Sequence, residues 1–436
     1  MRLHRISFFL LLVFLPTQLG LHFWPEWATV LGRRVDYLSP TLYLTDLLVL
    51  ATLVCWFISN VGVIPAAEPG SIRRNSGKTG FRVKPGMTAG ALAFLLFIFI
   101  NIVFATNKPV ALYAWLKLTE FGLLGFYIFK TKPSLSLIVF GLVPAVFYSS
   151  LIAFAQFFLQ HSVGGLLWWL GERTFNLNTP GIAHVNLCSP FSESCQLLLR
   201  PYATFSHPNV LAGFLAVTLP LVISQLSNNQ LVKPSNLKKI IYSTVLIMGV
   251  AALTLTFSRS GLMAGALGII ITARIAVQTK KLKKFLLFSC VILIFITLFQ
   301  LRNISLTDES LVVREQLNAA AAKLWSQSPI FGIGFGNFLV ELPQVLPSRS
   351  VYFLQPVHNI YLLILSETGI IGLILFLWLI WKSIGKAISK NERNHFITYH
   401  LSLITLLLLG LVDHYPLTLQ QGQLLLSFLL SLSLAY

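Results

Sequence analysis

The sequence predicts an all-α protein that crosses a membrane many times. Of its 436 residues, 56% are hydrophobic and 11% are charged, whereas soluble domains carry roughly 25% charged residues. The mean hydropathy is +0.77. Apolar runs recur at the length of roughly 20 residues that a helix needs to cross a bilayer. We therefore interpret residues 1–436 as one integral membrane domain with about twelve transmembrane helices.

The expected helices are the successive apolar runs of the chain. They cover approximately residues 6–24, 41–63, 88–106, 110–129, 134–160, 208–226, 240–257, 261–278, 285–301, 358–381, 396–412 and 421–435. The first run follows Arg2 and Arg5, as the apolar part of a signal peptide would. No small-residue cleavage site follows it, so we expect it to remain as a helix.

The positions of the basic residues predict the orientation. With the N-terminus in the cytoplasm, the short basic clusters fall into cytoplasmic loops, except for Arg33 and Arg34. This bias explains the net charge of +18 without a nucleic-acid partner. Both termini are then cytoplasmic. Residues 161–207 and 302–357 become long extracytoplasmic loops, the second of which lies between the ninth and tenth helices.

Two of the four cysteines, Cys188 and Cys195, lie in the first long loop. A disulfide between them is plausible because extracytoplasmic space permits oxidation. The alternative is two free thiols. No CxxC metal-binding pattern occurs in the sequence.

The second long loop contains a predicted amphipathic helix at residues 308–327, which we expect to rest on the outer leaflet or to cover a cavity. Its apolar residues recur at helical spacing. They are Val313, Leu317, Ala320, Ala321 and Leu324.

The segment FGIGFGNF follows this helix and supplies Gly332, Gly334, Gly336 and Asn337. It is not a dinucleotide-binding fingerprint, because no βαβ unit surrounds it. A turn with close backbone packing is the favoured interpretation. The alternative is a backbone nest for an anion, which Gly334, Gly336 and Asn337 would support.

Two arginines lie at predicted extracytoplasmic helix ends. Arg259 follows Ser258 in TFSRSG, and Arg200 precedes the sixth helix, which begins near Asn209. Guanidinium groups bind phosphate in a bidentate manner, and a helix start also favours anions. Both arginines are therefore candidate phosphate ligands. The alternatives are contact of Arg259 with lipid phosphate and solvation of Arg200.

His358 opens a long apolar run in PVHNIYLLILSETG. A neutral imidazole can take a proton from an acceptor hydroxyl near pH 7, which makes His358 a candidate general base. Asn359 and Tyr361 are placed to orient it or the acceptor. The alternative is a polar anchor at the membrane interface.

Further polar residues lie within or between the expected helices. Lys117 and Glu120 can pair at a spacing of three residues, with Asp46 as a third member. We favour structural pairing, and a substrate or proton path is the alternative. Asp413 and His414, between the last two helices, are expected to contact lipid headgroups.

Four segments of the chain resemble the O-antigen ligase/polymerase family of bacterial membrane glycosyltransferases. They are RPYATFSHPNVLAGFLAVTLPL, LTFSRSGLMAGALG, WSQSPIFGIGFGNF and HNIYLLILSETGIIGLILF. The resemblance implies a GT-C-type fold in the bacterial cytoplasmic membrane, with the active site on its outer face. It also implies that Arg200 and Arg259 bind the pyrophosphate of the donor and that His358 is catalytic.

The same resemblance implies a polyprenyl pyrophosphate-linked glycan as donor, such as one carried on undecaprenyl pyrophosphate. The acceptor would be lipid A core, a growing glycan or a protein, and ligase and polymerase are not distinguished. Because no Asp-x-Asp motif or extracytoplasmic carboxylate cluster occurs, we expect no metal and no cofactor. A transporter or flippase for an anionic solute or lipid-linked sugar is the main alternative, and a non-catalytic scaffold is another. A transporter would place its polar residues near mid-membrane in repeated halves.

Overall fold

A computed structural model describes residues 3–61, 85–188, 195–226, 235–277, 279–302, 309–347, 354–385 and 393–436. These residues are mostly helical, and short strands form three two-stranded sheets. The helices are α1 (Leu3–Val13), α2 (Leu44–Val61), α3 (Pro85–Val103), α4 (Lys108–Thr131), α5 (Leu135–Leu159), α6 (Pro208–Gln225), α7 (Asn236–Leu255), α8 (Arg259–Ala276), α9 (Lys280–Arg302), α10 (Glu309–Gln327), α11 (Phe338–Val345), α12 (Ile360–Gly385), α13 (Arg393–Leu409), α14 (Tyr415–Thr418) and α15 (Gln420–Ala435), with short 3-10 helices at Glu26–Ala28 and Gly165–Leu170.

Each predicted apolar run falls on a helix of the structure. In the part of the chain that is described, α5, α6, α7 and α12 are long and apolar enough to cross a membrane. The mostly helical membrane protein is therefore confirmed, while the number of twelve crossings stays a prediction. The remaining apolar helices are shorter or carry more charge within their length.

The first predicted helix, 6–24, is wrong in its second half. Helix α1 ends at Val13, and the chain forms β1 (Gly20–His22) instead. Pro16 interrupts the apolar run, because proline has no N–H to continue a helix. At 1.5 Å per residue, α1 spans about 16 Å, roughly half of a bilayer core.

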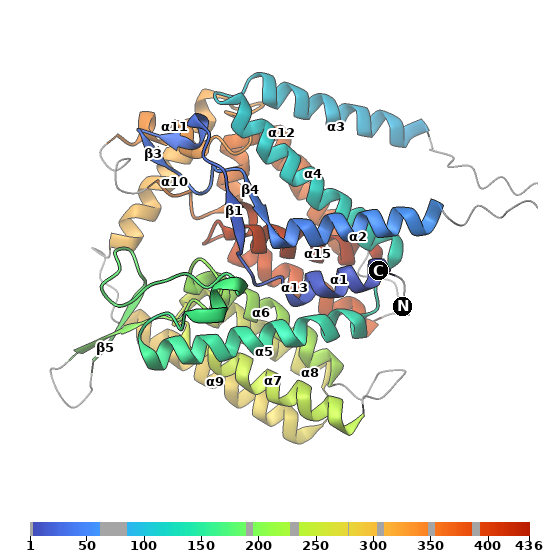
Figure 1. Cartoon of the computed structure of the whole chain (residues 1–436), viewed down its shortest axis with the longest axis vertical. Coiled ribbons are helices and arrows are strands. Elements are labelled where there is room, and N and C mark those ends of the chain that lie inside the picture. The colour runs from blue at the N-terminus through green and yellow to red at the C-terminus, as the bar shows by residue number, and fades with distance from the viewer. Residues whose placement is uncertain are drawn as a thin grey trace, which may run out of the picture.

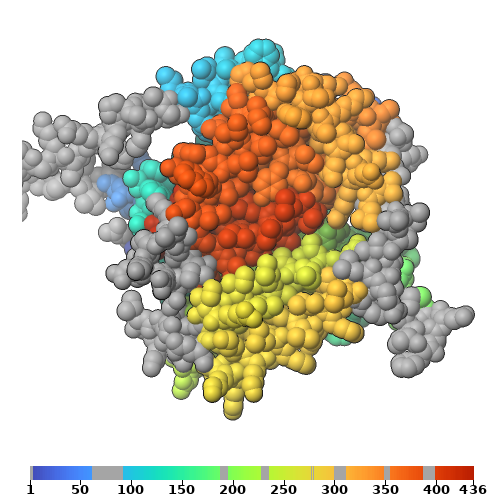
Figure 2. All heavy atoms as spheres, turned by 180° about the vertical axis from the view of Figure 1, so that it is seen from behind, coloured from blue at the N-terminus to red at the C-terminus, as the bar shows by residue number. Residues whose placement is uncertain are grey.

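Helix α6 lies at the centre of the helical core. It packs against α5, α7, α8 and α13, and almost every one of its side chains is buried. Figure 1 shows α5, α7, α8 and α9 grouped around it, with α1, α2, α4 and α15 forming the neighbouring group. From behind, the orange and red C-terminal segment lies between the yellow helices α8 and α9 and the cyan helix α3 (Figure 2).

The predicted amphipathic helix is confirmed as α10. All five of its predicted apolar side chains are buried, in a second hydrophobic cluster with residues of α11 and the segment 28–38. Helix α10 also packs against α12. It is therefore a packed part of the fold, and none of its residues lines the two cavities described below.

The strands are short and pair locally. Strand β1 pairs antiparallel with β4 (Thr41–Tyr43), and β2 (Thr29–Val30) pairs with β3 (Arg33–Arg34). In the first long loop, β5 (His184–Cys188) pairs with β6 (Cys195–Leu199), and Cys188 and Cys195 are register partners. Cys195 is disulfide-bonded, which agrees with the predicted bridge.

Candidate active site

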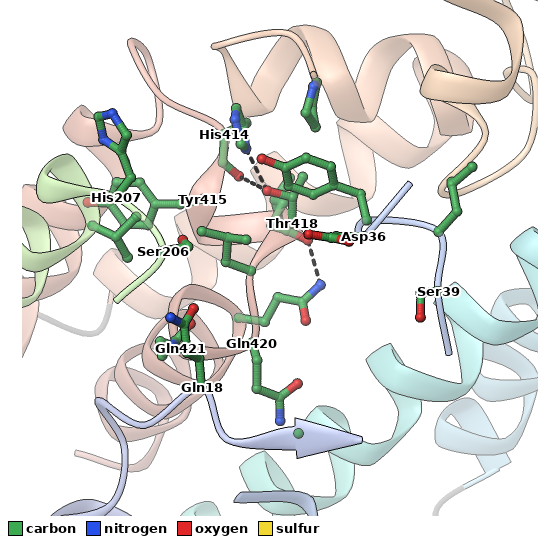
Figure 3. A pocket seen from close by; sticks show the side chains of 18 of the residues that line it. Gln18, Asp36, Ser39, Ser206, His207, His414, Tyr415, Thr418, Gln420 and Gln421 are labelled. Carbon is green, nitrogen blue, oxygen red and sulfur yellow. Dashed lines mark hydrogen bonds between the residues drawn. The ribbon is translucent and has the colours of Figure 1, made fainter. Parts of the chain in front are cut away.

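A cavity of about 590 Å³ gathers segments that lie far apart in the sequence. Its lining comes from the N-terminal strands, α4, the segment around residue 172, the start of α6, the segment around residue 336 and the loops on either side of α14. His207, Asn209 and His358 line it. Figure 3 shows His207, His414 and Gln420 around the same space. Of the predicted site residues, His358, Asn209 and Gly336 line the cavity, whereas Arg200 and Arg259 do not.

Arg200 is fixed by two hydrogen bonds beside this cavity. Its Nε donates to the carbonyl oxygen of Thr256 at 2.7 Å, and its Nη2 donates to Asn209 Oδ1 at 2.8 Å. Asn209 Nδ2 then donates to Asp413 Oδ2 at 3.2 Å. Asn209, in the first turn of α6, therefore connects a guanidinium to a buried carboxylate.

His358 lies on the other side of the same carboxylate. Its Nδ1 is 3.7 Å from Asp413 Oδ1, which is too long for a hydrogen bond. Nδ1 is buried and has no hydrogen-bond partner among the described residues. Ile360 N donates to Gly410 O at 2.8 Å, and this backbone contact holds the start of α12 beside the loop that carries Asp413.

The expectation that Asp413 and His414 contact lipid headgroups is wrong. Both residues are only 6% exposed. Asp413 Oδ1 accepts from His414 N at 2.8 Å, and the rings of His414 and His358 are 4.9 Å apart. The sequence did contain a signal for their place in the site: an Asp-His pair occurs in a short loop on the same predicted face as His358.

Burial controls the charge of this network. It lowers the pKa of Arg200 to about 10, so Arg200 stays protonated at neutral pH. Burial, together with the charge of Arg200, lowers the pKa of His207 to about 3. Burial lowers the pKa of His414 to about 4, although Asp413 opposes the shift. Burial raises the pKa of Asp413, but the nearby imidazoles of His358 and His414 outweigh it and hold that pKa well below its usual range.

Arg259 opens α8 close to Arg200, and its charge contributes to the lowered pKa of Arg200. Ser258 caps the helix by accepting a hydrogen bond from Gly261 N at 3.4 Å. Phe257, just before the cap, has φ +48°, a left-handed conformation that is strained for a bulky residue. No hydrogen bond or ion pair from any described residue reaches the Arg259 guanidinium, which leaves it available for a ligand.

The segment FGIGFGNF forms a turn against α12. Ile333 N and Gly334 N donate to the carbonyl oxygens of Ser366 and Glu367, both at 3.0 Å. Gly334 has φ +104°, and Gly332 approaches the backbone of Glu367 so closely that a Cβ would lie 2.3 Å from it. The favoured turn is confirmed, and these two N–H groups are not free to bind an anion. Gly336 lines the cavity, and Gly334 does not.

The side chains of Asn337, Asn359 and Tyr361, which were also predicted to support the site, form hydrogen bonds with backbone groups. Asn337 is fully buried, and its Oδ1 accepts from Asn107 N at 2.7 Å. Asn359 Oδ1 accepts from Tyr361 N at 2.9 Å at the start of α12. The Tyr361 hydroxyl donates to Leu407 O at 3.2 Å. Asn359 and Tyr361 thus hold the helix that begins next to His358.

The predicted pairing of Lys117 is confirmed. Its Nζ is 2.7 Å from Asp46 Oδ1 and 3.0 Å from Glu120 Oε2. Lys117 also lines the cavity, so a structural ion-pair cluster forms part of the cavity wall.

Within the part of the chain that the structure describes, His358, Asp413 and His414 form a group that could hold a metal ion. Their potential ligand atoms lie within 4.8 Å of one another. Internal contacts compete with such a role, because both oxygens of Asp413 accept hydrogen bonds and His414 Nδ1 lies 2.6 Å from Thr418 Oγ1. The arrangement therefore favours a network of protein groups.

Comparison with known proteins identifies one family. Residues 244–377 match the family model described as O-Antigen ligase. This stretch contains Arg259 and His358, whereas Arg200 and Asp413 lie outside it. A search of the curated proteins finds no match. The resemblance expected from the sequence motifs is confirmed: residues 244–377 are similar to the O-antigen ligase family.

Proposed function

We propose that the protein transfers a glycan from a polyprenyl pyrophosphate donor to a hydroxyl acceptor at the outer face of the bacterial cytoplasmic membrane. The family implies glycan transfer in envelope biosynthesis. The observation that carries the finer proposal is the hydrogen-bonded path from Arg200 through Asn209 to Asp413, with His358 Nδ1 3.7 Å from that carboxylate and Arg259 close to Arg200. The distribution of basic residues supports the outer face.

The two arginines stabilise the leaving group. Glycan transfer breaks the bond between the anomeric carbon and the pyrophosphate oxygen, and negative charge grows on that oxygen. Guanidinium groups placed in advance stabilise such charge. Arg200 is held by Thr256 and Asn209, and Arg259 keeps its guanidinium free for the phosphate.

His358 accepts the proton of the acceptor. As the acceptor oxygen bonds to the anomeric carbon, its proton passes to the imidazole and polyprenyl pyrophosphate departs. Asp413, on the Nδ1 side, stabilises the imidazolium that forms. Nε2 is then the atom that faces the acceptor hydroxyl.

An apolar groove beside the cavity fits the lipid part of the donor. It has a volume of about 480 Å³ and is lined mainly by α4, α12 and α15. Ala114, Phe335, Leu417 and Gln423 line both the groove and the polar cavity. A lipid-linked substrate can therefore place its chain in the groove and its polar part in the cavity.

The first prediction concerns Arg259. We expect Arg259→Lys to lower kcat/KM for the lipid-linked donor about tenfold or more, because an ammonium cannot make the bidentate contact. Transfer by purified protein measures this effect. Arg173→Lys is the matched control, since Arg173 lines the cavity without joining the network. Full activity of Arg259→Lys would rule out a bidentate contact.

Asp413→Asn tests the role of the carboxylate. We expect kcat to fall about a hundredfold. The reason is that the carboxylate no longer stabilises the positive charge that His358 gains when it accepts the proton of the acceptor. Asp36→Asn is the control, since Asp36 lines the cavity but is exposed. A variant that kept the wild-type kcat would contradict this role of Asp413.

Transfer is expected to continue in EDTA. The two guanidinium groups supply the charge stabilisation that a metal would otherwise give. The measurement is glycan transfer by EDTA-treated protein, with and without added Mg²⁺, Mn²⁺ or Zn²⁺. Activity that is lost and returns only with one of these ions would make His358, Asp413 and His414 a metal site instead.

Gly122→Leu tests the lipid groove. Gly122 lines the groove, and a Cβ at this position would have open space around it. The leucine should fill the groove and raise KM for the lipid-linked donor about tenfold. Gly385→Leu is the matched control, because Gly385 also lies in a helix with open space and is outside the groove. Equal KM values for the two variants would count against a lipid in this groove.

A further inference from the structure

Four glutamines line the polar cavity: Gln18, Gln420, Gln421 and Gln423. Three of them belong to the first turn of α15, and Gln18 lies just before β1. Figure 3 shows Gln18, Gln420 and Gln421 together, on the side of the cavity away from His414. The mechanism proposed above uses none of them.

The protein fixes the orientation of each amide. A carbonyl or carboxylate oxygen can only accept a hydrogen bond, so the amide nitrogen must face it and the amide oxygen must face away. All four side chains make such a contact through Nε2. The acceptors are Gly171 O for Gln18 (3.2 Å), Pro16 O for Gln421 (3.4 Å), Leu417 O for Gln423 (2.5 Å), and Asp46 Oδ1 for Gln420, which also donates to Thr45 Oγ1 (3.0 Å).

The four amide oxygens are left without donors among the described residues. Gln420 and Gln421 are each only 4% exposed. Gln420 Oε1 is fully enclosed and has no hydrogen-bond partner in the described part of the chain. A buried acceptor without a donor is unfavourable. The oxygens of Gln18, Gln421 and Gln423 lack donors but are not enclosed in this way, so a ligand that brings its own O–H or N–H groups can reach them.

The surroundings favour a neutral ligand. Amide oxygens repel anions, and the nearby carboxylates of Asp46 and Glu120 are already paired with Lys117. Aromatic rings also line the cavity, among them Tyr43 and Tyr113. Hydroxyl donors combined with C–H faces that pack on aromatic rings describe a neutral sugar.

We propose that Gln18, Gln420, Gln421 and Gln423 form a subsite that binds a neutral sugar residue of the substrate through its hydroxyl groups. The proposal rests on the proposed function, and it adds where the glycan is held. The sugar can belong to the donor glycan or to the acceptor, because both present the same hydroxyl chemistry.

Binding of free sugars tests the subsite without requiring activity. The full-length protein in nanodiscs is titrated with glucose and with N-acetylglucosamine, and binding is followed by saturation-transfer NMR. Methionine keeps the length of glutamine and removes the amide, so Gln421→Met and Gln18→Met should each weaken binding about fivefold. Gln225→Met is the matched control, since Gln225 is 3% exposed and lies outside the cavity. Thermal unfolding of each variant shows whether it is folded. If Gln421→Met does not fold, Gln18→Met still tests the subsite, because Gln18 is partly exposed.

Transfer kinetics identify which glycan occupies the subsite. The donor probe is the lipid-linked glycan that accumulates in cells lacking the gene. A KM that rises for this donor assigns the subsite to the donor glycan, and one that rises only for the acceptor assigns it to the acceptor.

Unchanged sugar binding and unchanged KM values in both folded glutamine variants would overturn the subsite. If His358→Ala abolishes transfer in that case, the proposed function still stands. If His358→Ala transfers normally, the proposed function fails, and the free-sugar titration still decides whether the subsite exists.

Discussion

The amide of Asn209 joins two opposite charges that the fold places near each other. It accepts from Arg200 at 2.8 Å and donates to Asp413 at 3.2 Å. In a direct salt bridge, Arg200 and Asp413 would direct their hydrogen-bonding groups at each other. A buried carboxylate without any partner would destabilise the fold. The neutral amide satisfies one side of each group. Arg200 therefore keeps N–H groups for the phosphate of the proposed donor, and Asp413 Oδ1, which accepts from His414 N, lies 3.7 Å from His358 Nδ1.

The turn before α8 holds the guanidinium of Arg200 but leaves that of Arg259 without a hydrogen bond or ion pair from the described residues. The carbonyl oxygen of Thr256 fixes Arg200, while the left-handed Phe257 and the cap by Ser258 start the helix that carries Arg259. Two guanidinium groups close together repel each other, and an anion between them removes that repulsion. The strained turn thus maintains an arrangement that a pyrophosphate would stabilise.

The sequence predicted the helices and the site in unequal measure. Apolar runs located each major helix, because hydrophobic length is a local property. Arg200 and His358 were recognised from short motifs, and the structure places them on either side of Asp413. Asp413 itself was misassigned, since its burial depends on the contact between Ile360 and Gly410 across two helices. The unpaired glutamine oxygens were equally invisible, because their orientation depends on tertiary contacts such as those of Gln421 with Pro16 O and of Gln420 with Asp46 Oδ1.

The boundary between the polar cavity and the apolar groove would determine how a substrate of the proposed reaction lies in the protein. Gln423 lines both surfaces, so the glutamine subsite begins where the apolar groove ends. Asp413 and His358 line the polar side only. A molecule that occupies both surfaces must change from apolar to hydroxyl-rich within a short distance of Gln423. A lipid-linked glycan has that character, whereas a uniformly polar solute or a simple lipid would leave one of the two surfaces unfilled.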